Sequence, residues 1–169
     1  MYVPSHFASD DEAAWQIVRD AGAGMLVIAG TEGLASVFAP VVISEDHSTL
    51  RSHIARANSW WRQVSPEAEV LAMFVAASAY VSPTYYPSRD RDPATVPTWN
   101  YEMAEVRGRV VVHEEPEWTA SQVRALTDRF EADRNPRWWL EDAPDPYLAR
   151  QLKAIVGLEI VVGSIEGKS

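Results

Sequence analysis

The stretch "EVLAMFVAASAYV" (residues 69–81) is apolar almost throughout and is rich in residues that favour β-strands. After a loop (82–97) that contains four prolines, "NYEMAEVRGRVVVHEE" (100–115) alternates between apolar and polar residues. Alternation is typical of a strand with one buried face, so we predict a second long strand there. Two such strands around a loop indicate a sheet as the basis of the fold.

Shorter strands are predicted on both sides of this pair. "MLVIAG" (25–30) and "LASVFAPVVI" (34–43) flank a short turn, and Pro40 indicates a sheet edge or a bulge in the second of them. "LEIVVGSIEG" (158–167) is predicted to close the chain as a strand.

Two helices are predicted in the N-terminal half from apolar spacing and capping residues. Ser9 and Glu12 have the form of a capping box, and the helix that they open should run to the glycines at 22 and 24. The stretch "STLRSHIARANSWW" (48–61) has apolar residues at three- and four-residue steps, which predicts a short helix that ends near Asn58.

Two further helices are predicted in the C-terminal half. "TASQVRALTDRFEAD" (119–133) is amphipathic, with Thr119 and Gln122 as a second capping box. The last helix should begin at Asp145-Pro146 and end at Gly157.

The order of these elements predicts the fold class. About six strands follow one another mostly through short turns, with helices at the beginning, middle and end, which favours an antiparallel sheet or barrel of the α+β class. With 169 residues and 47% hydrophobic content, the chain has the size of one domain with a core of its own (residues 1–169).

Composition excludes several kinds of site. The sequence has no cysteine, which rules out disulfides, cysteinyl zinc sites, iron–sulfur clusters and cysteine nucleophiles, and leaves four histidines as nitrogen ligands for a metal. The net charge of −9 and the absence of a basic patch argue against direct nucleic-acid binding. No signal peptide or membrane-spanning stretch is recognised, so we expect a cytoplasmic protein without membrane contact.

One histidine stands apart from the others. In the predicted helix, a step of three residues separates His53 from Arg56, and Asn58 follows at the helix end, so an imidazole, a guanidinium and an amide would share one rim. A solvated helix face explains the same residues equally well. For His6, His47 and His113 we expect surface or turn positions.

The segments that bracket the long loop, "YVSPTYY" (80–86) and "VPTWNY" (96–101), combine hydroxyls, aromatic rings and an amide. Such a mixture suits a flat ligand with a polar edge, because hydroxyls and amides in a core must each find a partner. Trp99 and Tyr101 share one face of a strand, and Asn100 lies on the other. The alternative places the two rings in the core and the amide at the surface. The tryptophan pairs at 60–61 and 138–139 are assigned to the core or to a subunit interface.

Five segments in the same order resemble the PaiB-like family of FMN-binding negative transcriptional regulators: "MYVPSHF" (1–7), "HIARAN" (53–58), "AYVSPTYY" (79–86), "PTWNY" (97–101) and "LKAIVGLEIVVGSIEGK" (152–168). The resemblance spans nearly the whole chain. It implies an antiparallel six-stranded split β-barrel with peripheral helices, a homodimer, and a planar cofactor near the subunit interface.

The sequence departs from the family pattern at several places. Ser59 stands where the family has proline, and Ser78 and Tyr85 stand where it often carries histidine and tryptophan. The family also continues past "EGK" into a tail that helps to hold the flavin, whereas this sequence ends at Ser169. Either the sequence is truncated, or this member holds a ligand other than ordinary FMN.

The haem-dependent piperazate synthases are a branch of this family, and they are the leading interpretation. They close a side-chain N-hydroxylated ornithine, an amino-acid derivative, into a ring through an N–N bond. The resemblance then implies haem b with His53 as axial ligand to the iron. Arg56 would hold the substrate carboxylate, with Arg89 and Arg91 as weaker choices. Proton transfer would be assigned to the tyrosines at the edges of the loop, Tyr85, Tyr86 and Tyr101.

The alternative interpretation is an FMN-binding protein, either a flavin oxidoreductase or a regulator. Arg56, Ser82, Thr98 and Lys168 would then serve the phosphate and the ring of the flavin, as the family resemblance implies. The full set of residues predicted to bind a cofactor, haem or FMN, is His53, Arg56, Asn58, Ser82, Thr98, Trp99, Asn100 and Lys168. A dimeric DNA-binding repressor is ranked last because of the acidic net charge.

Overall fold

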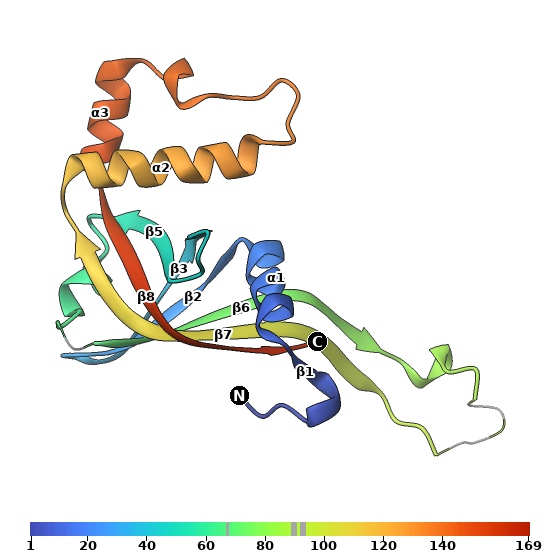
Figure 1. Cartoon of the computed structure of the whole chain (residues 1–169). Coiled ribbons are helices and arrows are strands. Elements are labelled where there is room, and N and C mark those ends of the chain that lie inside the picture. Colours follow the sequence, from blue (N-terminus) through green and yellow to red (C-terminus); the bar gives the residue numbers. More distant parts are fainter. Residues whose placement is uncertain (67, 89–90, 92–93) are drawn as a thin grey trace.

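The computed structural model describes residues 1–66, 68–88, 91 and 94–169. Figure 1 shows a strongly curved sheet with helices at its edges. The strands are β1 (Ala8–Ser9), β2 (Ala23–Gly30), β3 (Gly33–Pro40), β4 (Val42–Ile43), β5 (Thr49–Ala55), β6 (Glu69–Val81), β7 (Thr98–His113) and β8 (Ile155–Lys168). The helices are α1 (Asp11–Ala21), α2 (Pro116–Glu131) and α3 (Asp145–Lys153), with short 3₁₀ turns η1 (Ser5–Phe7), η2 (Ser59–Gln63), η3 (Pro83–Tyr85) and η4 (Leu140–Asp142).

All strand pairs among the described residues are antiparallel, in the order β3-β2-β6-β7-β8-β5-β4, and β1 pairs with β8. Six of the strands have seven residues or more, and β1 and β4 are two-residue additions. Five of the six long strands lie where the sequence predicted strands, and the sixth, β5, lies in a segment predicted to be helical. Pro40 ends the edge strand β3, as its missing N–H requires.

The inner face of the sheet carries the core. Alternate residues of the central strands point inward and are fully buried, among them Phe74 on β6 and Val106 on β7. The helix α1 packs on this face through Ala14, Trp15, Ile17 and Val18. The predicted amphipathic first helix is therefore confirmed.

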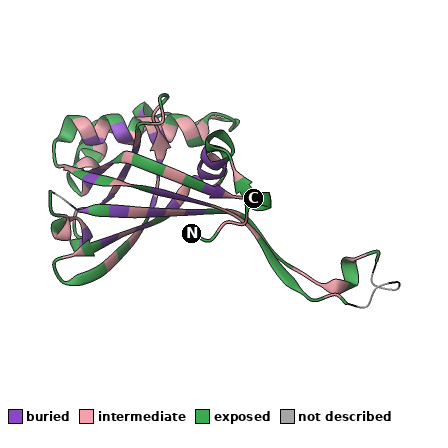
Figure 2. Ribbon diagram, turned by 60° about the horizontal axis from the view of Figure 1, so that its bottom comes forward, coloured by how far each residue is buried: buried purple, intermediate pink, exposed green. Residues whose placement is uncertain are grey.

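The opposite side of the sheet, here called the outer face, bears Val27, Leu71, Arg107, Val161 and His53. At one end α2 lies over β5 and β8, and α3 packs against α2 (Figure 1). At the other end β6 and β7 continue past Lys168, the last residue of β8, as a two-stranded arm (Figure 2). Much of the outer face between these ends is open, with Leu34 85% and Phe38 66% exposed.

The predicted helix over residues 48–61 is wrong. Residues 49–55 form β5, which pairs with β8 from Thr49 opposite Val161 to Ala55 opposite Ile155, and only η2 follows. Leu50 and Ile54 are four apart, a spacing that a helix and a strand both place on one face; Ser52 between them is also buried, as in a strand. His53 and Arg56 consequently do not share a helical rim.

Two other helix boundaries differ from the prediction. The helix α2 begins at Pro116, so Thr119 and Gln122 lie inside it, and the Thr119 hydroxyl donates to the carbonyl of Glu115. The helix α3 begins at Asp145 as predicted but ends at Lys153, because Gly157 already pairs with His53 in β8. Of the paired tryptophans, Trp60 is in the core, whereas Trp138 and Trp139 are about half exposed.

The first helix is capped by Asp10 and not by Ser9. The Asp10 carboxylate accepts from the amide of Ala13 at 2.9 Å, and Gly22, with φ of 66°, ends the helix where predicted. We expect Asp10→Ala to lower the free energy of unfolding by ~1 kcal/mol in urea denaturation, since it leaves an amide of the first turn unpaired. Ser9→Ala is the matched control and should change stability little; equal losses for the two variants would contradict this cap.

No helix in the described part of the chain is long and apolar enough to cross a membrane.

Candidate functional site

A hollow of about 430 Å³ lies at the root of the arm, between the last residues of β8 and the first residues of β7. We call it the arm hollow. Its lining consists of Phe7, Ala77, Ser78, Ala79, Thr98, Trp99, Asn100, Tyr101, Glu102, Lys168 and Ser169. Five of the residues predicted to bind a cofactor or substrate are therefore together in one place: Thr98, Trp99, Asn100, Tyr101 and Lys168.

The positive charge in the arm hollow belongs to Lys168. Its ammonium donates a hydrogen bond to the Tyr101 hydroxyl at 2.9 Å and lies 4.0 Å from the centre of the Tyr101 ring and 5.6 Å from that of Phe7. It has no carboxylate partner among the described residues. A cation held by aromatic rings without a counter-charge is suited to an anionic ligand.

The aromatic wall of the arm hollow is formed by Trp99 and Tyr101. The register, with Tyr80 opposite Trp99 and Ser78 opposite Tyr101, confirms that both rings lie on one face and Asn100 on the other. Trp99 is 60% exposed, and its indole N–H donates to the Ser78 hydroxyl at 2.7 Å. This ring is held in place by a hydrogen bond, lies 6.4 Å from the Tyr80 ring and is largely exposed, as a stacking surface for a flat ligand would be.

Two β-bulges bring these side chains to one face. In β8, Gly163 has no partner: Val162 is opposite Gly108, and Ser164 is opposite Arg107. Val161 and Ser164 therefore both face outward, and so does Lys168. Without the bulge, regular alternation counted from Val161 would place the Lys168 side chain on the inner face. A second irregularity, between Val75 and Ser78 of β6, does the same for Ser78.

The residues from the long loop lie outside the arm hollow. Ser82 begins η3, where its hydroxyl accepts from the amide and the hydroxyl of Thr84 at 3.2 and 2.9 Å. Tyr85 is 74% exposed, and Tyr86 ends the same turn. Arg91 does not line the hollow either. Arg89 lies outside the described residues.

The "HIARAN" residues lie at the opposite end of β8. His53 is paired with Gly157, which precedes Lys168 by 11 residues (168 − 157), or about 36 Å measured along the strand at the usual rise per residue. Arg56 donates to the Glu114 carboxylate at 2.5 Å and to the carbonyl of Lys153 at 3.1 Å, and Asn58 caps η2 by accepting from the amide of Trp60. Within one chain, these residues and Lys168 therefore cannot contact the same small ligand.

His53 itself is largely buried beneath α2. Its Nδ1 has no hydrogen-bond partner, and burial lowers the pKa of the imidazole below its ordinary value. His53 is therefore neutral at physiological pH, the form that ligates a metal. No group of three acidic, histidine or cysteine side chains suited to a metal ion occurs among the described residues.

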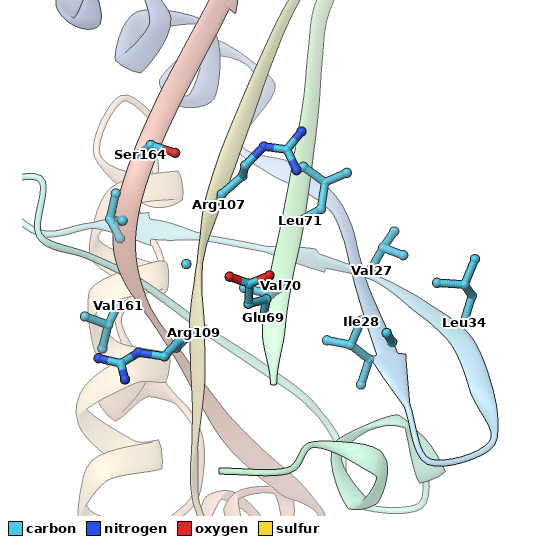
Figure 3. A pocket seen from close by; sticks show the side chains of 14 residues that line it. Val27, Ile28, Leu34, Glu69, Val70, Leu71, Arg107, Arg109, Val161 and Ser164 are labelled. Carbon is cyan, nitrogen blue, oxygen red and sulfur yellow. The ribbon is translucent and has the colours of Figure 1, made fainter. Parts of the chain in front are cut away.

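A second hollow, of about 640 Å³, lies on the open part of the outer face (Figure 3). Val27, Leu34, Leu71 and Val161 supply apolar walls, and Arg107 and Arg109 project from β7. Arg107 pairs with Glu105 at 2.9 Å. Sequence reasoning missed these arginines, although alternation within "RGR" (107–109) places both on one strand face.

Comparisons with known proteins show the family of this chain. Residues 1–164 match the model of a family described as "Putative FMN-binding domain". This chain belongs to that FMN-binding domain family. Over 98% of its length it is 31% identical to the Protease synthase and sporulation protein PAI 2 of Bacillus subtilis, of which the match covers 79%. The PaiB-like resemblance is thereby confirmed.

Solved structures with the same fold include flavin-containing proteins. The flavocytochrome Anf3 of Azotobacter vinelandii superposes with a TM-score of 0.74 at 12% identity, over 99% of this chain and 72% of its own. The FAD and heme binding protein of Mycobacterium smegmatis gives 0.68 at 15% identity, over 95% and 72%. The α+β split-barrel class predicted from sequence is confirmed, and these low identities carry the fold alone.

Proposed function

We propose that this protein binds FMN in the arm hollow. The observation that carries the proposal is the Lys168 ammonium, which lies beside the exposed Trp99 and the Tyr101 ring and has no carboxylate partner among the residues that the structure describes. The aromatic wall and the cation match the flat ring and the negative charge of a flavin nucleotide. The hollow is also within the size range of small-ligand sites.

The chain's own residues have distinct tasks in this proposal. Trp99 and Tyr101 would stack on the ring and exclude water from it, and the indole hydrogen bond to Ser78 keeps Trp99 in place. Lys168 would neutralise a negative group of the cofactor. A bound flavin supplies electron and hydride transfer, which no amino-acid side chain provides.

The family description and the names of the structural relatives support a flavin ligand. A homodimer, which the resemblance implies, would cover the apolar side chains of the open outer face, including Leu34 and Phe38. It would also allow the "HIARAN" residues of one copy to approach the arm hollow of the other. The net charge of −9 still argues against direct DNA contact as a repressor.

A second candidate function is haem-dependent N–N bond formation on an N-hydroxylated ornithine. The imidazole of His53 favours it, because its Nδ1 has no hydrogen-bond partner among the described residues and burial lowers its pKa; one structural relative is also described as binding heme. Haem iron would supply a Lewis acid in that chemistry. Arg56 is already paired with Glu114, and Tyr85, Tyr86 and Tyr101 lie far from His53 in the same chain, so FMN is ranked first.

Titration of the purified protein with FMN and, separately, with haemin tests the proposal. FMN should bind with one equivalent per chain and lose its fluorescence on stacking, and Trp99→Ala should weaken binding by about tenfold. Trp138→Ala, a half-exposed tryptophan outside the arm hollow, is the control. A Soret band that is lost in His53→Ala, without any response to FMN, would instead establish the haem alternative.

A further inference from the structure

The strand β3 forms one edge of the sheet, and β2 is its one hydrogen-bonded neighbour among the described strands. In Figure 3, Leu34 lies at this edge, beyond Val27 and Ile28 of β2. The opposite edge strand, β4, has two residues, and short edges are a common protection against pairing with another chain. β3 has eight residues and therefore leaves a much longer edge.

The register of the β2–β3 hairpin determines which backbone groups face this edge. Gly30 and Gly33 are paired across a two-residue turn, and such a pair exchanges both of its N–H···O bonds. Hydrogen-bonded and non-hydrogen-bonded pairs then alternate without a bulge to the end of β3. Leu34, Ser36 and Phe38 are in the non-hydrogen-bonded pairs, so their N–H and C=O groups point away from β2. They have no other backbone partner in the described part of the chain.

A hydrogen bond of Pro40 shows where this edge ends. The Pro40 carbonyl follows that of Phe38 by two residues and points in the same direction, and it accepts from the Ser52 hydroxyl of β5 at 2.7 Å. β5 therefore closes the edge at Pro40, whereas the segment from Leu34 to Phe38 has no described strand bonded to it on that side. The side chains at both ends of this segment are exposed, Leu34 by 85% and Phe38 by 66%.

The sequence of β3 lacks the features that keep edge strands apart. Natural edge strands carry lysine, an internal proline or a bulge, each of which turns another strand away. "GLASVFAP" (33–40) has no charged residue, its one proline is at the end, and its register with β2 has no bulge. An uncharged and regular edge of this length is suited to pairing with another strand.

We propose that the β3 edges of two copies of this chain pair antiparallel about a two-fold axis at Ser36, which joins their sheets into one. Ser36 then lies opposite Ser36 of the second copy, and Leu34 lies opposite its Phe38, twice by symmetry. Each of these pairs exchanges two N–H···O bonds, about six in all. This inference gives the homodimer a defined interface and does not require that FMN or haem binds.

The outward side chains favour a second copy as the partner. On the outer face each joined row is apolar throughout and consists of Ala29, Leu34 and, from the second copy, Phe38 and Met25. Apolar cross-strand pairs of this kind stabilise a sheet. The pairing also keeps carboxylates apart, since Glu32 of the turn falls opposite Pro40 of the other copy. This separation matters for two chains that each carry a net charge of −9.

Sedimentation equilibrium of the whole protein, without added ligand, tests the pairing. The wild type should form dimers at micromolar concentration. Ser36→Pro removes the N–H at the centre of the new pairing but none that bonds to β2, so the variant should fold. Its dimer dissociation constant should rise at least ~20-fold, because both central hydrogen bonds are lost. Ser36→Ala keeps the N–H and is the matched control, which should dimerise as the wild type does.

Amide exchange measured residue by residue separates edge pairing from other contacts. In the wild-type dimer the amides of Leu34, Ser36 and Phe38 should exchange slowly, and in Ser36→Pro those of Leu34 and Phe38 should become fast. The amides of Ala35 and Val37, which bond to β2, should stay slow in both proteins and report that the variant is folded. If the variant does not fold, the exchange of the wild type alone decides.

Three results would overturn the proposal. Fast exchange of Leu34, Ser36 and Phe38 in a wild-type dimer would mean that the copies meet elsewhere. A dimer that a folded Ser36→Pro variant leaves intact would mean the same. A wild type that stays monomeric at every concentration would leave the β3 edge to a strand of another protein.

Discussion

Lys168→Met is expected to weaken FMN binding by about 10- to 100-fold, measured by quenching of flavin fluorescence. The substitution removes the cation of the arm hollow but keeps an unbranched side chain that still packs on Phe7 and Tyr101. A hydrogen bond to a charged group contributes ~1.5–3 kcal/mol, which corresponds to this range of affinity. Because the Lys168 ammonium has no carboxylate partner in the described chain, its loss leaves no buried acid behind.

The composition offers a matched control for this variant. Lys153, at the end of α3, is the one other lysine of the sequence, and its side chain is exposed. Lys153→Met removes the same charge from the protein and should leave the affinity for FMN unchanged. If both variants bind FMN as the wild type does, the cofactor does not use the arm hollow. If both lose affinity equally, the effect is one of overall charge.

The arm hollow was partly predictable because its aromatic residues follow one another along a strand. The pairing of Trp99 with Tyr101 and the opposite position of Asn100 follow from two-residue periodicity alone. That Lys168 joins them was expected only from the family resemblance. Its side chain reaches this face because of the unpaired Gly163, and alternation counted through "IVVGSIEGK" (160–168) without a bulge would predict the inner face.

The grouping of His53, Arg56 and Asn58 with the arm residues was not predictable, and in one chain it does not occur. Leu50 and Ile54 satisfy both helical and strand spacing, and the pairing with β8 decides between them. In the folded chain Arg56 forms an ion pair with Glu114, and Asn58 caps η2. From the sequence alone, residues with these structural roles cannot be distinguished from ligand-binding residues. The spacing of Thr119 and Gln122 predicted a capping box. Gln122 is instead buried, and local spacing does not reveal this burial because it depends on a sheet that is distant in sequence.

The tight pairing of β7 and β8 at the bulge leads to the second large prediction. A Cβ on Gly108 would lie 2.2 Å from the carbonyl oxygen of Val161, and a backbone atom cannot turn aside as a flexible side chain can. We expect Gly108→Ala to lower the free energy of unfolding by about 2–3 kcal/mol in urea denaturation, the upper part of the usual cost of overpacking. The strands must separate to accept the methyl group.

Gly163→Ala is the control, because it adds the same methyl group to the other side of the same bulge. There the nearest atom, the carbonyl oxygen of Arg107, is 3.3 Å from the added Cβ, and the change in stability should stay within about 0.5 kcal/mol.

Since the bulge also turns Lys168 outward, Gly108→Ala should weaken FMN binding even at temperatures where it is fully folded, whereas Gly163→Ala should not. Equal stability of the two variants would mean that β7 and β8 leave room for a Cβ at Gly108, contrary to the 2.2 Å that separates this Cβ position from the carbonyl oxygen of Val161. If a folded Gly108→Ala protein binds FMN with normal affinity, the bulge is not needed to position Lys168 for FMN binding.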